Sequence, residues 1–368
     1  MIEAGADVNT PAATIFGNTA LEAASRNNDV DMARYLLGLG ADPDEISLDA
    51  AAVSGSVELV QTLLAARLHR YLRYSKGYGC VALCHAVGLK NTAVIEILLA
   101  NGIDSNAIIH RKIGDKKQYF PPSSLPPPPP PPPSPPGSPL PLPNFVYEES
   151  ALGCAIRTDK SDDLRIVRML LSGGANPNSM VANDQTALLA AIDQNNPPLV
   201  RVLIGAGADA NPSTICGVTR TPLQLAVEKG RADIVHILLE HGADVNAPPY
   251  DRHGATALQF AAIGGYVGIA HLLLQRGADV NASSAKIGGR TALEGAAEHG
   301  RIDMLQLLLN SGALIIGLGI EQYERARKFA SENGHISARR LLETYNAQIF
   351  ENVGWDPMLT DFGFLDFT

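Results

Sequence analysis

The 368-residue chain has few aromatic residues, few cysteines and no long apolar run. Aromatic side chains make up 5% of it, and Trp355 is the only tryptophan, so a core must consist of aliphatic residues and alanine. Four cysteines in a chain of this length form no disulfide framework and are typical of a reducing compartment. The longest apolar run, Leu314–Ile320, is far shorter than the ~20 residues that span a membrane. No signal-peptide pattern begins the chain. We therefore expect a soluble cytoplasmic or nuclear protein without a membrane partner.

The charge balance excludes a second class of partner. The chain has 29 Lys and Arg against 38 Asp and Glu, a net charge of −9, which argues against direct binding of nucleic acid. Apolar residues make up 46%, enough to bury a core and to exclude wholesale disorder. At about 150 residues per domain, this length predicts two or three domains or one elongated array.

The chain is organised by an internal repeat with two markers. The first marker is the turn GADVN at Gly5–Asn9, Gly242–Asn246 and Gly277–Asn281, with variants at Gly40–Asp44, Gly102–Asn106, Gly174–Asn178 and Gly207–Asn211. The spacing of the last copies is 35 residues. The second marker is Thr-(Ala/Pro)-Leu, 21 residues before a turn glycine, at Thr19, Thr186, Thr221, Thr256 and Thr291. Two markers in constant phase indicate a stacked array.

Each repeat is predicted to form two helices. Thr221 can cap the first helix, Pro222 fits its first position, and Gly230 can end it in a left-handed conformation. The second helix, Ala232 to Glu240, has a broad apolar face. Small residues on the first helices allow close stacking: Ala24, Ala191, Ala226, Ala261 and Ala296. One pair cannot bury its own apolar face, so the pairs must form a solenoid.

This pattern resembles the ankyrin repeat, whose consensus contains Thr-Pro-Leu-His and Gly-Ala-Asp-Val-Asn. The resemblance covers most of residues 1–345 and is most specific in 184–312. This chain departs from the consensus at the histidine after Thr-Pro-Leu, where it has Glu22, Leu189, Gln224, Gln259 and Glu294. We therefore expect the hydrogen bond that this histidine makes between adjacent turns to be absent. Long arrays of this type resemble ankyrin proteins of filamentous fungi.

The predicted fold is all-α: an ankyrin solenoid of about nine helix-turn-helix units with β-hairpin loops, interrupted by a proline-rich disordered loop. Residues 1–107 are N-terminal units, the first cut short by truncation or by a mis-assigned start, with 46–107 degenerate. Residues 108–148 are the loop insertion. The regular array is 149–322, a capping repeat 323–350 and an acidic-aromatic tail 351–368.

Two segments keep alternative interpretations. The proline-rich part of the insertion, 121–143, is either a ligand for a proline-recognition domain or a solvated spacer. The tail either stays free to dock on a partner or folds back, so that Trp355 and its phenylalanines cover apolar surface near Leu341 and Leu342.

Patterns that suggest chemistry are better explained by the repeat. Gly205–Ala210 matches a dinucleotide fingerprint, but it follows a helix and coincides with the repeated turn. Cys80 and Cys84, beside His85, lack a second pair at zinc spacing, so we interpret the cysteines as core residues. His236 and His241 are interpreted as exposed residues of a second helix. We expect no enzyme activity, no cofactor and no metal.

The resemblance implies a binding protein. In ankyrin arrays a partner protein usually lies on the concave face, formed by hairpin tips and the ends of first helices. The repeat register places these residues there: Asn183, Gln185, Asp193, Gln194, Arg220, Glu228, Lys229, Arg252, His253, Ile263, Arg290, Glu298 and His299. The predicted function is a non-catalytic protein-interaction scaffold. The alternative is a fragment of a regulatory or transcription-linked protein, in which the array docks while a missing N-terminal domain or the tail acts.

Overall fold

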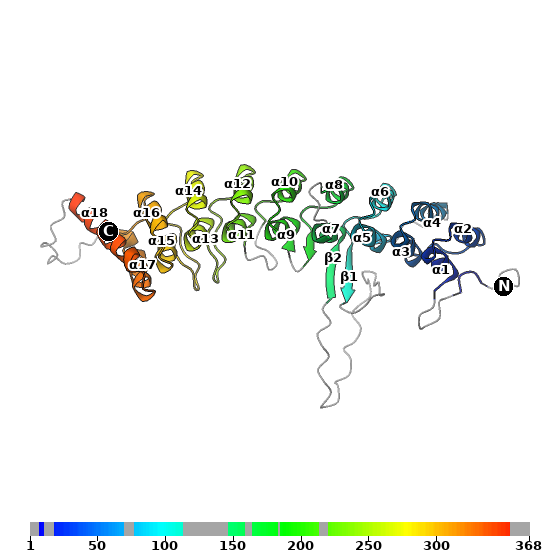
Figure 1. Ribbon diagram of the computed structural model, residues 1–368, viewed down its shortest axis with the longest axis horizontal. Helices are drawn as coiled ribbons and strands as arrows, with labels where there is room; N and C mark the ends of the chain where they lie inside the picture. The colour runs from blue at the N-terminus through cyan, green and yellow to red at the C-terminus, as the bar shows by residue number, and fades with distance from the viewer. Residues whose placement is uncertain are drawn as a thin grey trace, which may run out of the picture. The chain divides into compact units, whose positions relative to one another are not determined.

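A computed structural model describes residues 7–10, 18–69, 77–112, 146–158, 164–182, 185–212 and 220–353. Nearly all regular structure in these ranges is helical, and the helices come in consecutive pairs (Figure 1). Two short antiparallel strand pairs are also present. The expected all-α array is therefore confirmed. The chain divides into two compact units, residues 1–191 with 201–208 and residues 192–200 with 209–368, and each is described by itself.

Unit 1 contains four complete helix pairs and all four strands that the described residues form. Its helices are α1 (Ala20–Arg26), α2 (Val30–Gly38), α3 (Glu45–Ser54), α4 (Val57–His69), α5 (Cys80–Gly88), α6 (Thr92–Ala100), α7 (Ala151–Thr158) and α8 (Arg165–Ser172). Its strands are β1 (Ile108–Lys112), β2 (Val146–Ser150), β3 (Met180–Ala182) and β4 (Gln185–Thr186). The next pair, α9 (Ala187–Asp193) and α10 (Pro197–Gly205), contributes residues to both units.

Unit 2 contains the regular repeats and the last pair. Its helices are α11 (Pro222–Glu228), α12 (Ala232–Glu240), α13 (Ala257–Gly264), α14 (Val267–Gln275), α15 (Ala292–Glu298), α16 (Ile302–Asn310), α17 (Ile320–Glu332) and α18 (Ile336–Val353). A short 3₁₀ helix at Gly317–Gly319 precedes α17. The last pair is longer than the capping repeat expected at 323–350: α17 begins at Ile320, and α18 continues to Val353.

Capping boxes begin the first helices of the regular pairs. The Thr221 hydroxyl accepts from the Gln224 N–H, and the Gln224 side chain accepts from the Thr221 N–H. The same arrangement begins α1, α13 and α15. These bonds satisfy N–H groups that a helix start leaves without partners. The predicted cap at Thr221 is confirmed, as is the left-handed Gly230, with φ of 66°.

The buried glutamines of these caps also join neighbouring loops. Gln224 is 2% exposed, and its Nε2 donates to the carbonyls of Ala247 and Pro248, each at 3.0 Å. Gln259 binds the two corresponding carbonyls of the following loop at 2.9 and 3.0 Å. The prediction that this link is absent is therefore wrong for these repeats. An amide group carries two N–H donors and replaces the imidazole of the consensus histidine.

Asparagines of the turn motif form a second link between repeats. Asn246 Nδ2 donates to the Gly277 carbonyl at 3.0 Å, and its Oδ1 accepts from the Asp279 N–H at 2.9 Å. Equivalent pairs of bonds are made by Asn9, Asn106, Asn211 and Asn281. Each turn thus orients the backbone of the next one, which the motif alone did not reveal.

The core consists of alanine and aliphatic residues, as predicted. The alanines expected inside are buried: Ala24, Ala191, Ala226, Ala261 and Ala296. In unit 2, α13 packs against both α11 and α15, which is how neighbouring repeats share one core. Residues 46–107 also form buried helix pairs, in which Leu48, Leu63 and Leu83 are fully buried.

The insertion joins the array through a β-ribbon. Strand β1 pairs antiparallel with β2, with Ile108 opposite Ser150 and Lys112 opposite Val146 (Figure 1). The base of the 108–148 segment is therefore paired backbone. The proline-rich segment 121–143 and the end of the tail, including Trp355, lie outside the described residues.

Candidate interaction surface

The predicted partner-binding residues, called here the candidate strip, are carried by repeated positions of the fold. Those in unit 2 lie just before a first helix, at its C-terminal end or in the preceding loop: Asp193, Gln194, Arg220, Glu228, Lys229, Arg252, His253, Ile263, Arg290, Glu298 and His299. Gln185 is in β4 of unit 1, and Asn183 lies outside the described residues.

Two arginines of the strip are held by glutamates of their own repeats. Arg220 approaches Glu228 with Nε–Oε2 at 2.6 Å and Nη2–Oε1 at 2.9 Å. Arg290 approaches Glu298 in the same way, with distances of 2.8 and 3.2 Å. Arg290 donates two parallel N–H···O hydrogen bonds, which fix its guanidinium plane on the carboxylate, whereas Arg220 donates one, from Nη2, and its Nε adds an ion-pair contact. About a third of each side chain is exposed, so these pairs form a partly buried base of the surface.

Aromatic rings of the following repeats support both arginines. The Arg220 guanidinium carbon lies 5.4 Å from the centre of the Phe260 ring, and that of Arg290 lies 4.3 Å from the Phe329 ring. A guanidinium over a ring is attracted by the negative face of the ring. The arginines therefore contribute to stacking between repeats as well as to the surface.

The repeat between the two ion pairs is apolar at the same positions. Ala255 stands where the neighbours have arginine, and Ile263 stands where they have glutamate. Ala255 is buried, whereas Ile263 is partly exposed. Along three successive repeats of unit 2, the strip therefore carries an ion pair, then an apolar site, then a second ion pair.

The remaining helix-end residues are more exposed. The Lys229 ammonium lies 3.9 Å from the Asp193 carboxylate, which joins two adjacent repeats. The His299 ring nitrogen Nδ1 lies 3.0 Å from the Gly295 carbonyl of its own helix. Such contacts between exposed side chains contribute little to stability, so these side chains can turn toward a partner.

The hairpin tips that carry Arg252 and His253 are joined to the next tip. The His253 N–H donates to the Ile287 carbonyl at 2.8 Å, and the Ile287 N–H donates to the Asp251 carbonyl at 3.0 Å. Lys286 and Asp251 add an ion pair at 3.1 Å. These bonds hold the exposed Arg252 and His253 side chains on a defined backbone.

The structure adds two apolar residues that the sequence register missed. Tyr250 and Ile287 are 44% and 49% exposed on the joined tips. The repeat register is counted from the helix cap, and it does not predict side-chain positions in loops whose backbone conformation is unknown. The signal that could have found Tyr250 is its position after two prolines in an otherwise polar loop.

Residues that suggested chemistry have structural roles. Gly205 ends α10, so the dinucleotide-like pattern follows a helix, as expected. Cys80 and Cys84 are buried core residues, which confirms their interpretation, and His236 and His241 are exposed. Within the described ranges, no cluster of three or more His, Cys, Asp or Glu side chains could hold a metal ion.

A small acidic cluster in unit 1 involves the histidine beside those cysteines. His85 Nδ1 lies 2.5 Å from an Asp49 carboxylate oxygen, so its partner is a neighbouring helix. Near it, burial raises the pKa of the Glu45 carboxyl to about 7, although the Gly79 N–H donates to this carboxylate at 2.6 Å. The cluster lies where α3 packs against α5.

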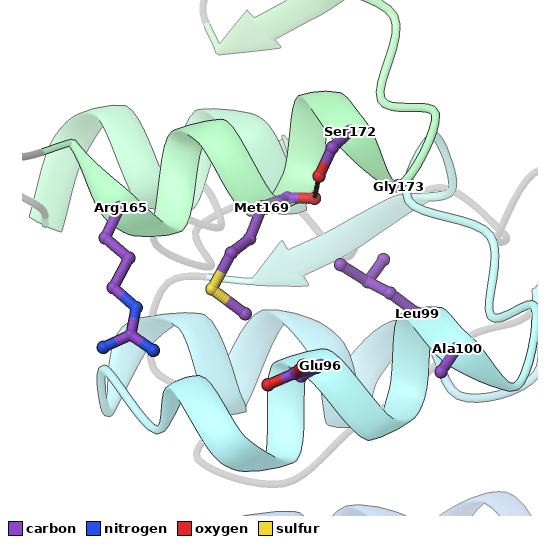
Figure 2. Close-up of a pocket in the computed structure, with 7 residues that line it drawn as sticks. All are labelled: Glu96, Leu99, Ala100, Arg165, Met169, Ser172 and Gly173. Carbon is purple, nitrogen blue, oxygen red and sulfur yellow. Dashed lines mark hydrogen bonds between the residues drawn. The ribbon is translucent and has the colours of Figure 1, made fainter.

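Unit 1 also has a groove between the second helices of the two repeats that flank the insertion. It has a volume of about 420 Å³ between α6 and α8. Figure 2 shows Met169 and Arg165 of α8 directed toward α6, where Glu96 and Leu99 lie. No sequence pattern indicates this groove, because the spacing of second helices depends on how the interrupted repeats stack.

Comparison with known families finds ankyrin repeats in both halves of the chain. A family model described as ankyrin repeats (3 copies) matches residues 152–249 and 248–317, and one described as ankyrin repeat matches 16–48. These matches together cover more than half of the chain. A search of curated proteins finds no match. Of the helices that the structure describes, none has the length and apolar character needed to cross a membrane.

Proposed function

The chain belongs to the ankyrin-repeat family, whose repeats are generally protein–protein interaction modules, and from this premise we propose that it is a non-catalytic scaffold that binds a partner protein through the candidate strip. One observation carries the proposal: in unit 2 the strip alternates fixed ion pairs with the apolar Ala255 and Ile263. This pattern supports recognition by shape and charge, because the base is rigid and the outer side chains can rearrange.

The partner surface follows from this pattern. An apolar side chain of the partner would contact Ile263, while polar groups on either side would meet Glu228 and Arg290. Arginine is frequent at the energetic centres of interfaces. A partner with an apolar anchor between groups of opposite charge fits best.

The test is a capture experiment with the full chain, followed by mass spectrometry of the bound protein. Replacing Arg220 or Arg290 by glutamate would place two carboxylates next to each other. A loss of binding in such a variant could then result from disturbed packing between repeats. The exposed side chains are better targets. We expect Lys229→Glu, Arg252→Glu and His299→Glu together to abolish capture while the circular dichroism stays unchanged.

A matched control uses exposed positions on the second helices of the same unit. His236→Glu, His271→Glu and Arg276→Glu introduce three acids on α12 and α14 and at the end of α14. The control should keep the partner bound. Retained binding by the strip variant would contradict the proposal, as would equal losses in both variants.

A further inference from the structure

An exposed apolar patch lies between the last regular repeat and the final helix pair. Leu314, Ile316, Leu318 and Ile320, called here the 314–320 patch, are 44%, 38%, 99% and 44% exposed. Each such side chain left in water forgoes the free energy of burial, and clustered apolar exposure typically marks a contact surface.

The patch replaces polar residues of the turn motif. Leu314 and Ile316 occupy the positions of Asp279 and Asn281 in the preceding repeat. The preceding turn binds backbone groups of this one: Asn281 Nδ2 donates to the Gly312 carbonyl at 3.1 Å, and the Leu314 N–H donates to Asn281 Oδ1 at 2.9 Å. A polar side chain would serve equally well at this position, so stacking with the preceding repeat does not account for leucine.

Helix α18 carries the chain toward this end of the array. The His335 ring, just before α18, packs against Gly300, just before α16. Further along, the Tyr345 hydroxyl donates to the Leu309 carbonyl near the end of α16 at 3.1 Å. The two helices therefore run in the same direction. From Tyr345, α18 continues to Val353, about 12 Å at 1.5 Å per residue, beyond the end of α16.

The patch lies on the chain that directly follows α16. The chain after Val353 thus starts on the same side of unit 2 as Leu314 and Ile316. Residues 354–368 can reach up to about 50 Å when extended, far more than a return to the patch requires.

We propose that the tail, residues 354–368, folds back onto the 314–320 patch. Its Trp355, Phe362, Phe364 and Phe367 supply apolar area, and its interleaved acids stay in water. The site differs from the one expected near Leu341 and Leu342, because Leu342 is already fully buried. This contact is independent of partner binding on the candidate strip.

Trp355 is the only tryptophan, so its fluorescence in the full chain reports the contact. In the unaltered protein we expect an emission maximum typical of a shielded indole and slow quenching by acrylamide. In Leu314→Ser/Leu318→Ser, emission should shift to longer wavelength and quenching should approach that of the denatured chain. Both side chains are exposed, so the array should keep its circular dichroism.

The matched control is Ile287→Ser, which removes a similarly exposed apolar side chain from a hairpin tip in the same unit. It should leave Trp355 emission unchanged. A solvated Trp355 in the unaltered chain would overturn the proposal. The proposal would also be overturned if Trp355 is shielded but its emission does not change in the Leu314→Ser/Leu318→Ser variant. Shielding that appears only with concentration, together with a dimer in sedimentation, would assign the patch to a second copy and equally overturn it.

Discussion

The residue that follows Thr-x-Leu at the start of a first helix forms different hydrogen bonds depending on whether it is glutamine or glutamate. Gln224 and Gln259 donate to loop carbonyls, which a carboxylate cannot do. Where the residue is Glu294, its Oε1 instead accepts from Arg325 Nε of the next repeat at 2.6 Å. At Glu294 the change from amide to carboxylate is thus accompanied by a basic residue, Arg325, at the position that meets it.

The first prediction concerns this amide. Gln259→Ala removes two bonds to buried or partly buried carbonyls and half of a capping box, so it should lower the free energy of unfolding by about 1–3 kcal/mol. Urea denaturation followed by circular dichroism measures the loss.

Two comparison variants make this result specific. Gln275→Ala removes an exposed glutamine from the second helix of the same repeat and should have almost no effect. Gln259→His restores the consensus residue and should retain part of the stability. If Gln259→Ala and Gln275→Ala unfold at the same urea concentration, the link between loops contributes nothing.

At the scale of elements, the ends of the insertion are held by the β1–β2 ribbon. Its register places Ile108 opposite Ser150, which directly precedes α7. The ribbon therefore delivers the chain to the next first helix whatever lies between the two strands. The length of the intervening segment should matter little, because the entropy of loop closure grows only with the logarithm of length.

The second prediction is that replacing residues 113–145 by an Asn-Gly turn leaves the thermal midpoint nearly unchanged. Asn-Gly fits a two-residue hairpin and keeps both strands. Deleting residues 109–142, which also removes most of β1, should lower the midpoint more. A large loss of helicity in the turn variant would show that the segment is needed for folding.

At the scale of the whole molecule, stability in a repeat array is the sum of each repeat and its contacts with its neighbours. Residues 184–312 combine regular 35-residue spacing, three capping boxes and continuous asparagine links. Residues 49–151 match neither ankyrin-repeat model, and α5 begins at Cys80 without a side-chain cap, since the preceding residue is Gly79. Residues 184–312 are therefore stabilised by more caps and inter-repeat bonds than residues 46–107, although both regions bury leucines.

The third prediction is that amides in 46–107 exchange with solvent faster than those in 184–312. Weak repeats open first and weaken their neighbours, because each shares its core with the next. Native-state hydrogen exchange with fragment analysis measures both regions in one sample. Equal or greater protection in 46–107 would contradict the expectation.

Four features could be predicted from the amino-acid sequence: the repeat, the helix pairs, the threonine caps and the alanine-rich core. These features are encoded within single repeats, at fixed distances from Thr221 or Gly242, and recur often enough to be read without a structure. Local chemistry was sufficient because a cap or a left-handed glycine depends on residues three or four positions away.

The interactions between neighbouring repeats could not be predicted from the sequence, because they arise when the repeats stack. The bonds from Gln224 to the next loop, the support of Arg290 by Phe329 and the exposure of Leu318 all depend on stacking. Each joins or separates side chains that belong to different repeats, and no local pattern specifies their distance. Within a repeat, too, the arginines that the sequence assigned to a partner are held by Glu228 and Glu298, because the fold brings the loop before each first helix to the end of that helix.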